Sequence, residues 1–146
     1  SHVAMVEIDR QTGRTNILKY FLVDDCGTRL NPANVEGQIQ GGVAQGVGAA
    51  LFEEYVYNDE CQPLVSTFVD YLMPTIHEVP MTKKGEVCTP SPFAPLGAKG
   101  CGEGAIHTTP ATLMCAINDA FAPLGLKIHE TPASPHRLWK LLQQVK

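Results

Sequence analysis

The sequence has no long apolar run and no cluster of basic residues. Its 146 residues include 11 Lys and Arg against 15 Asp and Glu. A nucleic-acid-binding protein needs a basic surface for the phosphate backbone, so we exclude that class and expect no nucleic-acid partner. Gly, Pro or charged residues interrupt every apolar stretch before it reaches the roughly 20 residues of a membrane-spanning helix. The sequence therefore predicts a protein without a membrane span.

The cysteines and histidines lack the patterns of disulfide or metal-binding proteins. The five cysteines are odd in number and include no C-x-x-C pair, so we predict free thiols in a reducing, cytoplasmic setting. We expect small buried side chains for most of them, and an accessible one only at Cys101, between two glycines. The five histidines show no i, i+4 pair, which disfavours a histidine metal site. We expect no secretory signal, because neither a basic nor an apolar segment precedes the first strand-like residues.

The first third of the chain predicts a β-hairpin followed by a long helix. Residues 3–9 and 15–23 are rich in β-branched and aromatic types, and a turn-like insert separates them. Asn31 and Pro32 form a helix start, because Asn caps a helix and its first position tolerates Pro. We expect the helix to cover residues 32–54.

Glycines lower the intrinsic stability of this predicted helix, and each costs roughly 0.8–1 kcal/mol relative to Ala. Some contact must offset that cost. Gly37, Gly41 and Gly46 follow one another at about four-residue spacing, so another backbone or a flat ligand can come close. Packing on a neighbouring helix and contact with a ligand both remain open. Gln38 and Gln45, seven residues apart, project from about the same side.

The middle of the chain predicts little regular structure. Residues 58–80 mix apolar residues of both periods, and prolines divide them into short pieces, so we expect at most a short helix or strand. Residues 86–88 are a candidate strand. A proline-rich loop follows at 89–96.

The last third is more orderly. Thr109 and Pro110 repeat the cap-and-proline signature and predict the start of a second helix. Residues 126–131 alternate like a strand, and Ser134 with Pro135 predicts a C-terminal helix. The expected order is hairpin, long Gly-rich helix, irregular middle, then helix, strand and helix. This order indicates an α+β fold rather than a doubly wound sheet.

A glycine-rich loop at 97–104 surrounds one carboxylate, Glu103, with four glycines. Neighbours without side chains neither shield this carboxylate nor pair with it, so the backbone can bend to bring it into a cleft. A Glu in a water-excluded pocket at a helix start can act as a general base. The alternative interpretation is a solvated surface turn, as in most glycine-rich loops.

Taken together, the motifs resemble one enzyme family. They comprise residues 23–27, 31–32, 37–48 and 97–103. In this order they are similar to the C-terminal part of the molybdopterin-binding large subunit of the xanthine dehydrogenase, aldehyde oxidase and aerobic carbon monoxide dehydrogenase family. The resemblance covers nearly the whole chain.

The resemblance implies an oxidoreductase that hydroxylates an electron-poor carbon with oxygen derived from water. Glu103 occupies the place of the family's essential glutamate, which acts as the base in this reaction. Gln38 matches a glutamine that hydrogen-bonds the molybdopterin. The resemblance assigns no metal ligand to the chain.

Further cofactor contacts are implied by position in the same motifs. The loop of Gly100, Cys101 and Gly102 matches the segment that lies beside the metal, and its glycines permit close approach to a bulky cofactor. Gln45 and Lys99 are expected to support the same site.

The family's large subunits are much longer than this chain. The resemblance therefore implies that residues 1–146 form a single domain, a C-terminal cofactor-binding fragment that is inactive alone. The implied cofactor is molybdenum–molybdopterin, in the cytosine dinucleotide form for a bacterial protein, with Fe–S clusters and FAD on other domains or subunits. The implied partners are the remainder of the large subunit, the iron–sulfur and flavin subunits or domains, and a small-molecule substrate. Apolar surface facing the rest of the subunit predicts self-association of the fragment.

Departures from the family pattern leave the substrate unassigned. Gly104 follows Glu103 where animal xanthine oxidases have Pro, which makes the chain more similar to the bacterial carbon monoxide dehydrogenase type. Residues 106–109 differ from that type as well. Two other classes stay open: a non-catalytic packing or assembly domain whose glycines serve only helix contacts, and an independently folded binding module.

Overall fold

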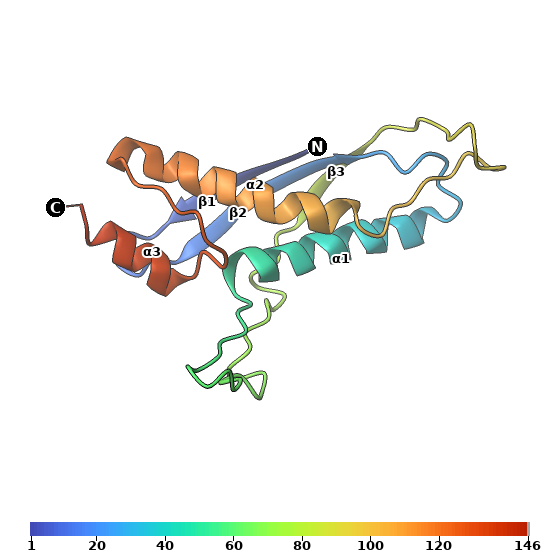
Figure 1. The fold of residues 1–146 in the computed structure, drawn as a ribbon. Coiled ribbons are helices and arrows are strands. Elements are labelled where there is room, and N and C mark those ends of the chain that lie inside the picture. Colours follow the sequence, from blue (N-terminus) through green and yellow to red (C-terminus); the bar gives the residue numbers. More distant parts are fainter. Residues whose placement is uncertain (146) are drawn as a thin grey trace.

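A small mixed sheet packed against helices forms the body of the molecule, and a long irregular segment leaves it (Figure 1). The computed structural model describes residues 1–145. This arrangement confirms the predicted α+β class. The elements in chain order are β1 (His2–Ile8), β2 (Thr15–Asp24), α1 (Pro32–Leu51), β3 (Thr82–Glu86), α2 (Gly104–Phe121), the short 3-10 helix η1 (Ala122–Leu124) and α3 (Pro135–Leu142).

The hairpin β1–β2 is confirmed, and it forms two of the three strands of the sheet. The strand order is β1-β2-β3, with β1 antiparallel and β3 parallel to the central strand β2. Side chains alternate across a strand, so Tyr20 and Leu22 enter the core while Phe21 and Val23 face outward. The sheet is therefore buried on the face that meets the helices.

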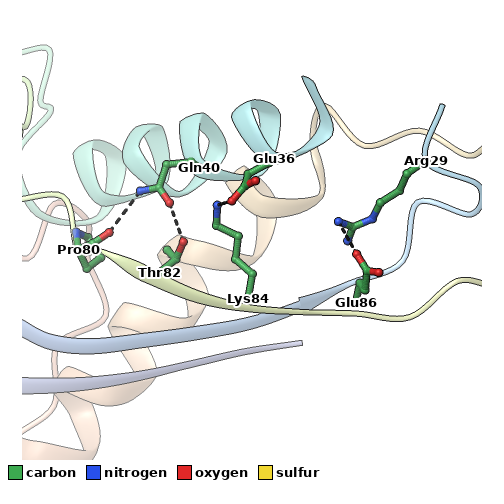
Figure 2. Close-up of polar contacts among 7 residues, drawn as sticks. All are labelled: Arg29, Glu36, Gln40, Pro80, Thr82, Lys84 and Glu86. Atoms are coloured by element: carbon green, nitrogen blue, oxygen red, sulfur yellow. Dashed lines mark hydrogen bonds and ion pairs between the residues drawn. The ribbon is translucent and has the colours of Figure 1, made fainter. Parts of the chain in front are cut away.

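The strand predicted at 86–88 is wrong in its bounds, because β3 ends at Glu86. Its sequence is mostly polar and carries no hydrophobic alternation, so contacts with other elements decide its place. Gln40 of α1 donates to Pro80 O at 3.3 Å and accepts from Thr82 Oγ1 at 2.6 Å (Figure 2). Two ion pairs complete the anchorage, Lys84 with Glu36 and Arg29 with Glu86.

The start of α1 is confirmed, and its end comes earlier than predicted. The Asn31 side chain accepts the N–H of Asn34 at 3.1 Å, as a helix cap does. The helix ends at Leu51 rather than 54, where the N–H groups of Phe52 and Glu53 both bond to Gly48 O.

Glycines let α1 and α2 approach each other closely. A Cβ built on Gly46 would lie 2.5 Å from Thr109 Cβ, and one on Gly42 would lie 2.8 Å from Ala105 Cβ. Real Cβ atoms do not come that close to a neighbour, so this contact requires glycine. The packing interpretation of the stripe is therefore correct for Gly46 and wrong for Gly37 and Gly41, where a built Cβ would meet nothing within 4 Å of the described residues. Gly42 packs although it was not part of the predicted stripe.

The predicted start of the second helix at Thr109 is wrong, because α2 begins at Gly104 and holds Pro110 in its interior. A proline there removes a helical hydrogen bond. Tertiary packing outweighs this local penalty, since the turn before Pro110 is the part of α2 that fits against Gly42 and Gly46. Local sequence signals alone do not contain that contact.

The strand predicted at 126–131 is also wrong, since this segment has no regular structure. The side chain of Asn118 in α2 forms the hydrogen bonds that a neighbouring strand would otherwise provide at Ile128. It accepts from Ile128 N–H at 2.9 Å and donates to Ile128 O at 3.0 Å. The C-terminal helix α3 is confirmed, with Ser134 at its cap position and Pro135 as its first residue.

Buried polar contacts link the sheet to α2. Thr109 is fully buried, accepts from Tyr20 Oη at 3.0 Å and donates to Ala105 O at 2.8 Å. His2 Nδ1 lies 2.8 Å from the same tyrosine oxygen, and burial lowers the pKa of His2. No helix within residues 1–145 is long and apolar enough to span a membrane.

All five cysteines are free thiols, but their exposure differs from our expectation. Only Cys26 is buried. Cys101 is half-buried, whereas Cys61, Cys88 and Cys115 are exposed. Within the described residues, no group of three or more His, Cys, Asp or Glu side chains is arranged to hold a metal ion.

Candidate functional site

Glu103 lies where the glycine-rich loop meets α2. It is the N-cap residue of the helix, with φ −106° and ψ −12°, and its carbonyl accepts from His107 N–H at 3.1 Å. Its carboxylate makes no capping hydrogen bond. The side chain is exposed, so residues 1–145 do not build the water-excluded pocket that we expected around it.

The loop that carries Glu103 runs beside the first turns of α1 and the end of β2. A Cβ built on Gly102 would lie 3.9 Å from Gln38 Oε1, and one on Gly104 would lie 3.4 Å from Asp24 Oδ1. The structure thus brings two predicted site segments together, although they are far apart in the sequence. Glu103 lies between these two glycines in the sequence.

One side of α1 is left uncovered next to this loop. Gly37, Gln38, Gly41 and Gln45 are all exposed, and we call them the open face of α1. A Cβ on Gly37 or Gly41 would have no heavy atom within 4 Å. The two glutamines lie about 10 Å apart along the axis, at 1.5 Å per residue. The open face is a strip with two amide groups and no bulky side chain between them.

Asp25 anchors the glycine-rich loop to the segment between β2 and α1. Its Oδ1 atom pairs with Lys99 Nζ at 2.9 Å and accepts the N–H groups of Gly27 and Thr89 at 3.0 and 3.1 Å. Lys99 and these backbone bonds hold the pKa of the Asp25 carboxyl well below its usual range. Lys99 N–H also donates to Cys26 O at 2.8 Å.

The ion pair between Asp25 and Lys99 gives both residues a structural role in holding the loop. The ammonium of Lys99 is engaged by Asp25, so Lys99 holds the loop in place. Asp25 itself was not among the predicted site residues. The only sequence signal for Asp25 is its place in the 23–27 motif. That motif does not indicate that its partner is Lys99, 74 residues further along the chain.

Two glycines make the contact between the anchor segment and the loop possible. Gly27 and Gly97 have φ angles of 63° and 71°, a conformation that favours glycine. A Cβ on Gly27 would lie 2.2 Å from Gly97 O. The two segments are joined by an isolated bridge between Gly27 and Ala98.

A pocket of about 200 Å³ lies between these segments and the start of α1. Cys101 and Lys99 line it from the loop, and Asn34 lines it from α1. A larger cavity of about 640 Å³ lies at the other end of α1, next to Leu51 and Phe52, and none of the predicted site residues line it. Most of the predicted site residues therefore lie near the N-terminal end of α1.

The arrangement suits proton transfer beside a flat ligand. An ionised Glu side chain only accepts hydrogen bonds, and each Gln side chain both donates and accepts. Gly100, like the two glycines of the open face, has no heavy atom within 4 Å of a built Cβ. A planar ligand with polar edges can approach these residues without meeting a side chain.

Comparison with known proteins gives consistent matches. Residues 1–80 match the molybdopterin cofactor-binding domain family. The chain is 37% identical over 143 residues to the carbon monoxide dehydrogenase large chain of Hydrogenophaga pseudoflava, covering 98% of this chain and 18% of that protein. It is 39% identical over 137 residues to the nicotine 6-hydroxylase large subunit of Paenarthrobacter nicotinovorans, covering 94% and 17%.

Solved structures of related proteins have the same fold. The crystal structure of quinoline 2-oxidoreductase from Pseudomonas putida 86 superposes with a TM-score of 0.96 at 44% identity, covering 99% of this chain and 18% of that one. The chain thus spans less than a fifth of the length of these relatives. It belongs to the molybdopterin cofactor-binding domain family and is homologous to a portion of the large subunit of molybdenum hydroxylases.

Proposed function

We propose that this chain is the C-terminal part of a molybdenum hydroxylase large subunit and supplies the catalytic base, Glu103. The observation that carries the proposal is that the two neighbours of Glu103, Gly102 and Gly104, lie near Gln38 and Asp24, next to the open face of α1. The fragment is expected to be inactive alone, because most of the large subunit lies outside it.

The residues present fit a molybdopterin. A pterin is flat and carries hydrogen-bond donors and acceptors on its edges, and the open face combines amide side chains with space above glycines. Gln38 and Gln45 would hold the cofactor by these amides. The backbone of Gly100, Cys101 and Gly102 would lie beside it. The cytosine dinucleotide form, and the Fe–S clusters and FAD of further domains or subunits, belong to the same proposal.

Glu103 acts by proton transfer in this proposal. When bound, the cofactor supplies the metal centre that takes up the electrons of the oxidation. Glu103 accepts at its carboxylate the proton of the water-derived hydroxyl group that attacks the electron-poor carbon of the substrate. Asp25 and Lys99 hold the loop that carries Glu103.

The test is Glu103→Gln in the complete, assembled enzyme. The amide keeps the size of the side chain but cannot take the proton, so we expect turnover to fall by about 10²- to 10⁴-fold while the molybdenum content stays unchanged. Aromatic N-heterocycles, an aldehyde and carbon monoxide serve as the substrate panel. The loss should extend to whichever substrate the unaltered enzyme turns over.

Glu130→Gln is the matched control, since Glu130 is an exposed glutamate outside the site. It should leave both turnover and molybdenum content unchanged. Ordinary turnover by Glu103→Gln would refute the role of base and leave the chain as an assembly domain. Loss of molybdenum in Glu103→Gln would instead make Glu103 a cofactor-holding residue.

A further inference from the structure

Residues 53–80, which we name the arm, leave the body between α1 and β3 (Figure 1). Between Tyr55 and Val79, Val65 is the only buried residue. Exposed fractions reach 76% at Phe68 and 86% at Ile76. The large apolar side chains that the arm exposes are Tyr55, Val56, Tyr57, Leu64, Phe68, Val69, Leu72, Met73 and Ile76.

The arm has a defined shape despite its lack of helices and strands. Asn58 Oδ1 accepts the N–H groups of Glu60 and Gln62 at 3.1 and 2.8 Å. Asp70 Oδ2 accepts from Thr67 Oγ1 at 3.1 Å. Such side-chain-to-backbone and side-chain bonds stabilise tight turns. The exposed apolar side chains are therefore carried on a folded segment.

Both ends of the arm are tied to the body. At its start, Glu54 pairs with Arg137 of α3. Within the arm, the Tyr71 hydroxyl donates to Glu53 at 2.8 Å and closes the segment on itself. At its end, Gln40 of α1 bonds to Pro80 and Thr82 (Figure 2). The arm is thus presented in a fixed direction.

The charge of the arm is of one sign. It contains six of the 15 Asp and Glu residues of the chain and none of the 11 Lys and Arg. Only Glu54 pairs with a cation of the described residues, Arg137 of α3. The rest of the chain carries a net charge of +2. A surface that matches the arm must combine apolar contact with positive charge.

We propose that the arm is a docking element that binds an apolar groove rimmed by Lys or Arg, supplied by the remainder of the large subunit. The proposal rests on the proposed function, because it assumes that larger subunit. More than four-fifths of each relative lies outside the matched region, so ample polypeptide exists to cover the arm. An uncovered apolar patch of this kind marks an interaction site.

Cross-linking of the complete large subunit tests the occupant directly. A carbodiimide joins carboxylates to amines in contact, so Asp59 and Glu60 should cross-link to lysines outside residues 1–146. Amide exchange across residues 55–79 should be at least about tenfold slower than in an open loop. Cross-links only to a second copy or to another subunit, or exchange as fast as in a free loop, would overturn the proposal.

A charge reversal supplies the second readout. The double change Asp59→Lys and Glu60→Lys should restore fast exchange in the arm, whereas Glu130→Lys, outside the arm, should leave the exchange slow. Slow amide exchange in the arm of this double variant would contradict the proposal that Lys or Arg residues rim the groove. Turnover of Glu103→Gln reports separately on the proposed function, so an undocked arm with a catalytically essential Glu103 would sink the docking proposal alone.

Discussion

Helix α1 presents glycine on two sides, and the two sides differ in what they touch. Gly42 and Gly46 meet α2 at distances that exclude any side chain. A Cβ built on Gly37 or Gly41 would meet no heavy atom within 4 Å. The first pair stabilises the fold by letting two helices approach. The second pair costs helix stability in residues 1–145 and makes no contact there in return.

The difference shows that a glycine stripe is not a single signal. The sequence spacing suggests one stripe through positions 37, 41 and 46, but the structure divides the glycines into a packed row and an open row. The packed row explains the fold. Contacts within residues 1–145 do not explain the open row, and the proposed function assigns it to the cofactor.

The largest effect is expected from Gly46→Ala. The added Cβ would lie 2.5 Å from Thr109 Cβ and 3.2 Å from Pro110 Cδ, so α2 must shift away from α1. Overpacking of this kind typically costs about 1–3 kcal/mol, enough to outweigh the roughly 1 kcal/mol gained in helix propensity. Urea denaturation followed by circular dichroism measures the loss. Unchanged or higher stability would mean that the two rows do not differ as described.

Gly41→Ala is expected to act in the opposite direction. Its Cβ meets no atom, so the free energy of unfolding should rise by up to about 1 kcal/mol. In the complete enzyme, the same methyl group should lower the molybdopterin content if the open face holds the cofactor. Gain of stability with full cofactor content would leave the open row without a ligand-binding role.

Much of the fold follows from local sequence signals. The hairpin, the Asn31 cap of α1 and the start of α3 come from alternation and capping residues, which act within a few positions. Three features depend on distant contacts instead: β3 pairs with β2 despite a polar sequence, α2 extends past Pro110 onto the α1 glycines, and Asn118 satisfies the backbone at Ile128.

The site shows the same division. The meeting of the 97–104 loop with Gln38 follows from the motif resemblance and agrees with the geometry. The contact between Asp25 and Lys99 could not be predicted in this way, because no local sequence pattern shows which distant lysine a carboxylate in a turn binds. The water-excluded pocket expected around Glu103 is not formed by residues 1–145, where its side chain is exposed.

The smallest effect is expected from Asp25→Asn. This change tests whether Asp25 holds the 97–101 loop beside Gly37 and Gly41, the open row of α1. The pKa of Asp25 lies below 3.8 in the fold because its ionised form binds Lys99 and two N–H groups. That contribution is complete above pH 3.8 and is lost as the pH falls through the lower, folded-state value. The unaltered chain should therefore keep its 97–101 loop anchored at about pH 4 and loosen it only as the pH falls further toward the folded-state pKa of Asp25. Asp25→Asn should show the loosened loop at pH 7 already.

Backbone NMR of the Lys99 and Gly100 amides measures this loosening, with Asp9→Asn as the matched control. The pKa of Asp9 is also lowered, by hydrogen bonds to Gln11 and Thr12 within the hairpin turn, but Asp9 is not part of the anchor of this loop. Only Asp25→Asn should shift the two amide signals at neutral pH. Equal shifts in both variants would mean that Asp25 does not position the loop. The open face of α1 would then have no anchored loop beside it, and nothing would distinguish it from an ordinary exposed helix surface.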